Sequence, residues 1–116
     1  MKVFVYFNLH KKLFSVKALE GPQKGKVIKH AENLCLQDVV FKVSQAGRQR
    51  VLKEKRKNVH AGVVGFLSEP SSEDRVLVTY NPYKYSTFVF KENEQPILKA
   101  KSVVLNSHDR SIWACI

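Results

Sequence analysis

The chain has 116 residues, of which 44% are hydrophobic and 10% aromatic, and it carries a formal net charge of +10. This length and apolar content predict a single globular domain over residues 1–116 and exclude a disordered or fibrous chain. No apolar run approaches the roughly 18 residues that cross a bilayer, and the start of the chain lacks the pattern of a signal peptide, so we expect no membrane association.

The first thirty residues predict three short strands. Residues 2–8 and 12–19 are rich in β-branched and aromatic side chains, and the residues between them predict a hairpin with a basic tip. A turn rich in glycine at 21–25 precedes a third strand at 26–30. Turns this short favour an antiparallel meander.

The middle of the chain predicts one strand followed by one helix. Residues 39–43 are apolar except for Lys42 and indicate a buried strand. The pattern of the preceding residues does not define where this strand starts. Ser44 can cap a helix with its hydroxyl group, and no proline interrupts the residues that follow it as far as Lys57. We therefore expect the main helix at about residues 44–57.

The second half of the chain predicts only strands and turns. Residues 59–67 combine glycines with β-branched residues, which favours a strand, and an acidic loop follows at 68–74. Four further strand-like runs, separated by turn residues, predict a second meander: 75–80, 86–91, 99–106 and 111–116. The expected fold is therefore α+β, mainly β, with two antiparallel meanders forming a curled sheet or small open barrel and one basic helix.

The excess positive charge lies entirely in the first half of the chain. Residues 1–57 hold 14 Lys and Arg against 4 Asp and Glu, whereas residues 58–116 hold six of each and are neutral. Such an uneven distribution predicts a surface that attracts a polyanion or an acidic partner. The alternative is that folding mixes the two halves over one surface.

The expected helix is too basic and too weakly amphipathic to be explained by packing. Val51 and Leu52 are its bulky apolar residues, so it should dock shallowly, and Glu54 is its one acid, whereas surface helices usually alternate charges. We predict that the helix binds an anionic partner with help from the hairpin tip and the following turn. The predicted contacts are Arg48, Arg50, Lys53, Lys55, Arg56 and Lys57 in the helix and Lys11, Lys12, Lys24 and Lys26 outside it.

Two kinds of partner fit these cations. The phosphate backbone of DNA or RNA is the first, because each neutralised phosphate releases counterions, and an acidic protein surface is the second. Exposed edge strands in a small sheet also allow a homodimer. Aromatic residues could add base stacking, although in strands they more often pack in the core: Tyr6, Phe7, Tyr80, Tyr83 and Tyr85.

The sequence contains few residues in a pattern that indicates catalysis. His60 is the one weak candidate, as the acid or base of a metal-independent ribonuclease, but a histidine between Val59 and Ala61 is more often a packed structural residue. Cys35 and Cys115 are far apart, and no cysteine or histidine pair has the spacing of metal ligands. We therefore expect no metal, no cofactor, reduced thiols and a cytoplasmic location.

Three segments resemble small uncharacterised proteins encoded by tailed bacteriophages: residues 6–16 (YFNLHKKLFSV), residues 47–62 (GRQRVLKEKRKNVHAG) and residues 80–86 (YNPYKYS). The resemblance covers most of the chain and brings no catalytic residues with it. It implies a protein made in the host cytoplasm during infection, for host takeover, genome handling or anti-defence.

Three functions are therefore expected, in order. The first is a non-enzymatic phage accessory protein that binds the nucleic-acid backbone through the basic helix and hairpin tip. The second is an inhibitor or adaptor that binds an acidic surface of a host nucleic-acid enzyme. The third is a small metal-independent ribonuclease.

Overall fold

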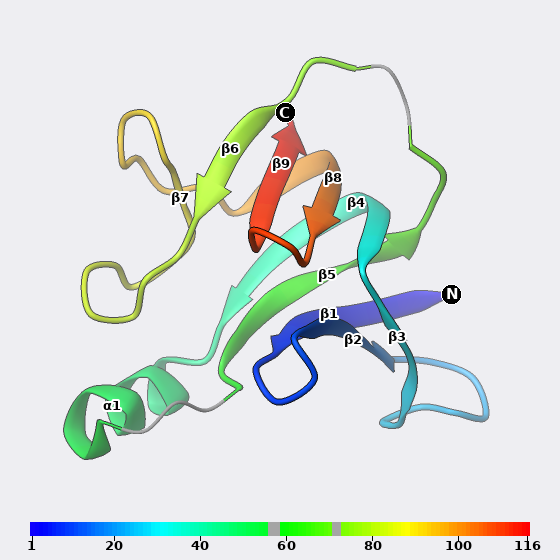
Figure 1. The fold of residues 1–116 in the computed structure, drawn as a ribbon, viewed down its shortest axis with the longest axis horizontal. Coiled ribbons are helices and arrows are strands. Elements are labelled where there is room, and N and C mark those ends of the chain that lie inside the picture. Colours follow the sequence, from blue (N-terminus) through cyan, green and yellow to red (C-terminus); the bar gives the residue numbers. More distant parts are fainter. Residues whose placement is uncertain (56–58, 71–72) are drawn as a thin grey trace.

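The protein forms one curled antiparallel sheet with a short helix beside it (Figure 1). The structure is a computed structural model that describes residues 1–55, 59–70 and 73–116. In this part of the chain the strand order is β3-β2-β1-β5-β4-β8-β9-β6-β7. The strands are β1 Lys2–Asn8, β2 Leu13–Ala18, β3 Val27–Ala31, β4 Asn33–Val43, β5 Ala61–Leu67, β6 Val76–Thr79, β7 Val89–Phe90, β8 Lys99–Asn106 and β9 Ser111–Cys115, and the helix is α1 Gln45–Glu54.

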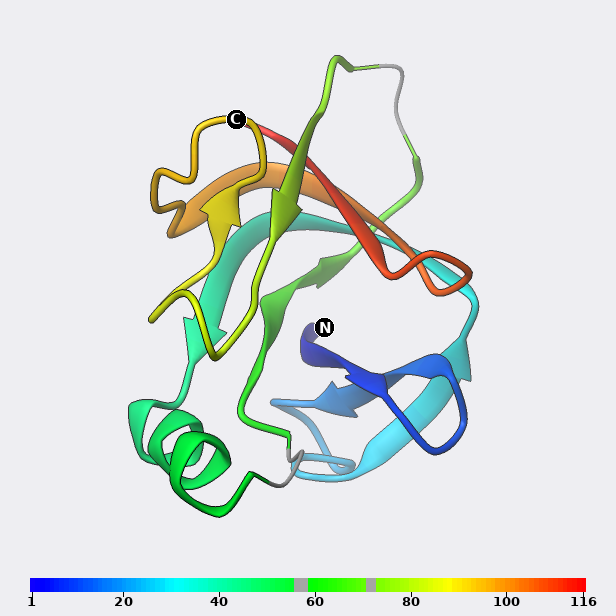
Figure 2. The same ribbon diagram turned by 60° about the vertical axis from the view of Figure 1, so that its left-hand side comes forward.

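The predicted fold class, α+β and mainly β, is confirmed, and the sheet is curled but not closed into a barrel, since β3 and β7 form its two edges. Curvature comes partly from irregular pairing. The register of β4 against β5 shifts between Gln37 and Val40, where Asp38 has a φ of 52°. An extra residue of this kind bends a strand and increases its twist. Figure 2 shows the result: β1 and β2, in blue, lie opposite β6 and β9, in yellow-green and red.

The hydrophobic core fills the concave side of this curl. Val5 and Val16 from the first strands pack in one cluster with Val78 of β6, Leu105 of β8 and Leu36 of β4. Each of these side chains is at most 3% exposed. Every second side chain along a strand points to the same face of the sheet. Because the sheet is curled, the side chains on its concave face pack against one another and form the core.

Most predicted boundaries agree with the structure to within two residues, and three elements differ by more. β4 starts at Asn33 rather than at residue 39, because Leu34 and Leu36 also belong to the core and this part of the strand pairs with β8. α1 ends at Glu54, since Lys55 adopts the left-handed conformation and its N–H donates to the carbonyl oxygen of Val51. The strand expected at 86–91 is reduced to Val89–Phe90.

The strand order of the second half also differs from a simple meander. The hairpins β6–β7 and β8–β9 both form, but β9 pairs with β8 on one side and with β6 on the other. The two central strands β4 and β5 join this half to the β1–β2–β3 meander. Among the described residues, no helix is long and apolar enough to cross a membrane.

Candidate nucleic-acid interface

Helix α1 is capped as the sequence predicts and docks shallowly. The Ser44 hydroxyl accepts a hydrogen bond from the Gly47 N–H at 3.1 Å, and the Ser44 N–H donates to the His60 carbonyl oxygen at 2.7 Å. Within α1, only Gly47 and Val51 are buried. A Cβ atom at Gly47 would lie 2.5 Å from the Cβ of His60, so the helix backbone rests directly against this histidine. Apart from the half-buried Arg48, the polar residues of α1 are exposed.

Arg48 links the helix to the loop after β6. Its Nε donates to the carbonyl oxygens of Pro82 and Tyr85, at 3.0 and 2.8 Å, and the residue is half-buried. A hydrogen bond that involves a charged group usually stabilises a fold by about 1.5–3 kcal/mol. Arg48 therefore has a structural role that the sequence did not indicate, and its binding to phosphate stays a prediction.

Three of the predicted helix contacts are exposed: Arg50, Lys53 and Lys55. Neither salt bridge found within the described residues includes any of them, since one joins the N-terminal amine to Glu20 and the other joins Lys84 to Glu94. Their charges are thus open to an external anion. The other two predicted contacts, Arg56 and Lys57, lie outside the described residues.

The predicted contacts outside the helix are exposed as well, on two well-defined turns. In the β1–β2 turn, the Asn8 side chain accepts hydrogen bonds from the N–H groups of His10 and Lys11, both at 3.0 Å, and Lys12 has a φ of 58°. This fixed backbone presents Lys11 and Lys12 to solvent. The β2–β3 connection carries the exposed Lys24 and Lys26.

These basic segments share one edge of the molecule. In Figures 1 and 2, α1, the β1–β2 turn and the β2–β3 connection all lie along the lower edge, whereas the β5–β6 connection lies at the upper edge. The described part of that connection carries the exposed acids Glu69, Glu73 and Asp74. Glu20, at the basic edge, accepts a hydrogen bond from the Lys2 N–H at 2.9 Å. Folding therefore keeps much of the basic and acidic charge apart.

A groove of about 570 Å³ opens beside α1, between the ends of β1, β5 and β6. Its aromatic lining residues are Tyr6, Phe7, Tyr80 and Tyr83. The guanidinium of Arg110 lies 4.6 Å from the centre of the Phe7 ring. Within the described chain its lining contains no aspartate or glutamate. Sequence reasoning had no signal that could select Arg110, because this residue lies in the neutral half and reaches the groove only through the β8–β9 hairpin.

His60 is held in the wall of this groove. Its Nε2 lies 2.7 Å from the Tyr80 hydroxyl oxygen, and the two rings meet edge to face with centres 5.5 Å apart. Burial raises the pKa of Tyr80, although the nearby charge of Arg48 acts in the opposite direction, so the phenol stays protonated at neutral pH. With contacts to Gly47, Ser44 and Tyr80, His60 connects the helix to the sheet.

The five aromatic residues suggested for base stacking have different surroundings in the fold. Phe7 and Tyr80 pack against the core, and Tyr6 and Tyr83 also line the groove, with Tyr83 58% exposed. Tyr85 instead donates its hydroxyl proton to the Glu94 carboxylate, beside Lys84. Tyr83 is therefore the most accessible aromatic surface of this groove.

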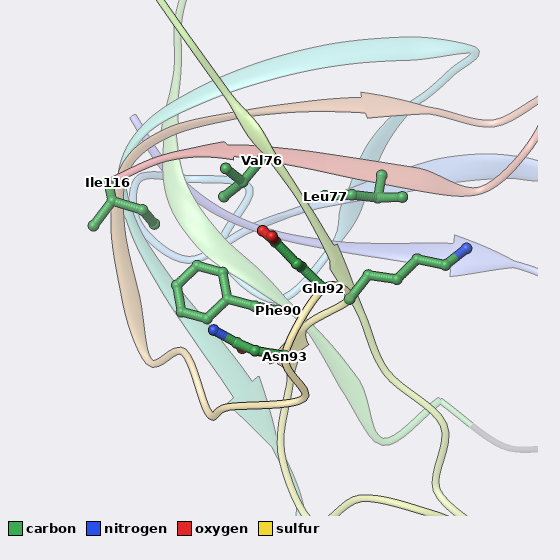
Figure 3. Close-up of a pocket in the computed structure, with 7 residues that line it drawn as sticks. Val76, Leu77, Phe90, Glu92, Asn93 and Ile116 are labelled. Carbon is green, nitrogen blue, oxygen red and sulfur yellow. The ribbon is translucent and has the colours of Figure 1, made fainter.

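A second hollow, of about 480 Å³, lies near the C-terminal end of β9 (Figure 3). Figure 3 shows Val76, Phe90 and Ile116 around it, together with Glu92 and Asn93. Its lining includes both Lys91 and Glu92, so it offers no net charge to an anion. The groove beside α1 is the hollow that adjoins the basic helix.

Metal-binding and cysteine chemistry have little support within the described residues. No three His, Cys, Asp or Glu side chains in this part of the chain are placed to hold a metal ion together. Cys35 and Cys115 are both free thiols. Burial raises the pKa of the Cys35 thiol, and a hydrogen bond with Glu73 raises that of Cys115, so both favour the protonated form.

The fold and this surface define a class: a small, mainly β protein with one basic edge and a short helix docked shallowly on the sheet. Residues 1–112 match the family model of the Mycobacterium phage L5 gene 82 protein. The gene 82 protein of Mycobacterium phage L5 is itself 42% identical over 114 residues, which cover 91% of this chain and 90% of that protein. The chain therefore belongs to the family of this phage protein, which confirms the resemblance to bacteriophage proteins. No solved structure matches it significantly.

Proposed function

We propose that this phage-family protein is a non-enzymatic accessory protein that binds the phosphate backbone of nucleic acid in the cytoplasm of the infected host. The contacts are the exposed cations of α1 and of the two basic turns. The observation that supports this most is that Arg50 and Lys53 of α1 and Lys55 directly after it are exposed, and none of them has a salt-bridge partner in the described chain. Phosphates would relieve their mutual repulsion and release counterions on binding.

The contacts of His60 favour binding over ribonuclease activity. A general acid or base must reach a substrate proton, but His60 is hydrogen-bonded to Tyr80 and pressed against the backbone of α1 at Gly47. Removing this imidazole would therefore disturb the packing of α1 against the sheet. We assign His60 a structural role at the edge of the binding surface.

Fluorescence anisotropy with labelled 20-mer DNA and RNA tests this function. The variant Arg50→Glu/Lys53→Glu/Lys55→Glu should bind about 100-fold or more weakly at low salt, because three contacts become repulsive. The control Lys91→Glu/Lys99→Glu/Lys101→Glu carries the same net charge but changes exposed lysines on β8 and on the turn after β7. It should retain most of the affinity, and circular dichroism should show that both variants are folded.

Two results would contradict the proposal. Equal losses in both triple variants would mean that only net charge matters, and no binding by the parent protein at low ionic strength would remove nucleic acid as the ligand. In the second case, affinity purification from nuclease-treated infected cells would show whether an acidic host protein binds the same cations instead.

A further inference from the structure

The groove beside α1 points to single-stranded nucleic acid. We propose that it receives an unpaired base of a strand whose phosphates lie on the basic edge. This inference rests on the proposed function and adds the strandedness of the ligand to it.

The groove is lined partly by apolar side chains that are exposed to solvent and are not buried in the core. Leu9 from the β1–β2 turn, Val59 before β5 and Tyr83 after β6 come from three separate segments, and they are 42%, 58% and 58% exposed. All three line the same hollow of about 570 Å³. Such a volume is within the usual range for small-molecule sites, and exposed apolar side chains gathered in one hollow commonly mark a binding surface.

Cations surround this apolar lining. Arg110 lines the groove and is exposed, and Lys11 and Lys12 follow Leu9 in the same turn. On the other side, Val51 lines the groove, and the N–H of the exposed Lys55, directly after α1, donates to the Val51 carbonyl oxygen. A ligand with a flat apolar part and anionic groups beside it fits this arrangement, and a nucleotide within a strand has this chemistry.

The acidic residue Asp109 lies close to the groove, and its carboxylate is hydrogen-bonded within the β8–β9 turn. Asp109 lines an adjoining hollow of about 380 Å³ that shares Phe7, Tyr80 and Arg110 with the groove. Its carboxylate accepts a hydrogen bond from the Ser111 N–H at 2.9 Å, and hydrogen bonds from Ser111 lower its pKa. The acid therefore stabilises the β8–β9 turn that carries Arg110.

Single strands suit the groove better than duplexes. In a duplex the bases are paired and stacked, so a base must first unpair and leave the stack before it can enter a protein pocket. In a single strand a base can turn away from its neighbours and stack on an aromatic side chain without first breaking a base pair. Tyr83 is exposed enough to serve as this surface.

The test compares three fluorescein-labelled 20-mers at equal ionic strength: oligothymidylate, an abasic strand with the same phosphates, and a duplex. The parent protein should bind oligothymidylate about tenfold or more tightly than the abasic strand. Tyr83→Ala should remove this preference, whereas Tyr83→Trp should keep it. Trp113→Ala is the matched control, because Trp113 is 41% exposed on β9 and does not line the groove.

The outcomes separate this inference from the proposed function. If the abasic strand and oligothymidylate bind equally well to the parent protein, phosphate binding stands and the base site is wrong. A duplex that binds more tightly than oligothymidylate would also contradict the inference. If none of the three ligands binds, the proposed function fails together with the inference.

Discussion

At the scale of single residues, Gly47 and His60 decide how the helix meets the sheet. Gly47 is one of two buried residues in α1, and the absence of its side chain lets the helix backbone lie against the Cβ of His60. The sequence allowed the prediction that His60 is structural, because its neighbours are apolar. It could not identify Gly47 as its partner, since a glycine in a helix pattern does not reveal what approaches it.

Gly47→Ala should destabilise the protein. Alanine favours a helix by about 1 kcal/mol over glycine, which by itself would stabilise the protein. The added methyl group would clash with the Cβ of His60, and we expect this clash to cost about 1–3 kcal/mol and to outweigh the gain. Urea unfolding followed by circular dichroism measures the change. Gln49→Ala, at an exposed position of the same helix, should have almost no effect. A stabilised Gly47→Ala protein would show that the helix does not rest on His60.

Tyr85 and Glu94 give a second test at this scale. The hydrogen bond from the Tyr85 hydroxyl, and then the charge of Lys84, lower the pKa of the Glu94 carboxyl. Tyr85→Phe should therefore raise that pKa toward its ordinary value, as followed by NMR titration of the carboxyl carbon, while Tyr83→Phe should not change it. Because the folded-state pKa is lowered, the pair stabilises the protein above the unfolded pKa, and this contribution is lost as the pH falls. An unchanged titration in Tyr85→Phe would exclude this hydrogen bond.

At the scale of elements, local signals predicted the helix start and most strands, but not the contacts between them. Ser44 was identified as the N-cap from its hydroxyl and the uninterrupted residues after it, and this is confirmed. The sequence predicts Arg48 only as a contact to an anionic partner, whereas its Nε also donates to carbonyl oxygens 34 and 37 residues away. Likewise, no local pattern places β9 between β8 and β6, because strand order depends on long-range pairing.

Arg48→Ala should therefore cost more stability than Arg50→Ala. The first change removes hydrogen bonds from a charged donor to the carbonyl oxygens of Pro82 and Tyr85, for which we expect a loss of about 1.5–3 kcal/mol. The second changes an exposed residue and should stay within about 0.5 kcal/mol. Thermal unfolding of both variants at one pH and salt concentration makes the comparison. Equal stabilities would mean that Arg48 does not hold the helix in place.

At the scale of the whole molecule, the uneven charge of the sequence is kept in the fold. The basic helix and turns lie along one edge, away from the acidic β5–β6 connection (Figure 1). The uneven charge of the sequence predicts such a surface, but it leaves open whether folding mixes the two halves, because they pair within one sheet through β4 and β8. The groove could not be predicted from the sequence, because its lining residues come from both halves of the chain. Arg110 and Tyr83, for example, belong to the neutral half.

The salt dependence of nucleic-acid binding tests the central claim most directly. Affinity for a labelled single-stranded 20-mer should be measured by anisotropy between 50 and 200 mM salt, where about five neutralised phosphates predict a slope of about −3.5 in log affinity against log salt concentration. Arg50→Glu/Lys53→Glu/Lys55→Glu should lower both the affinity and the steepness of this slope. A slope near zero in the parent protein, or no binding at the lowest salt concentration, would contradict the assignment of the basic edge as a phosphate-binding surface.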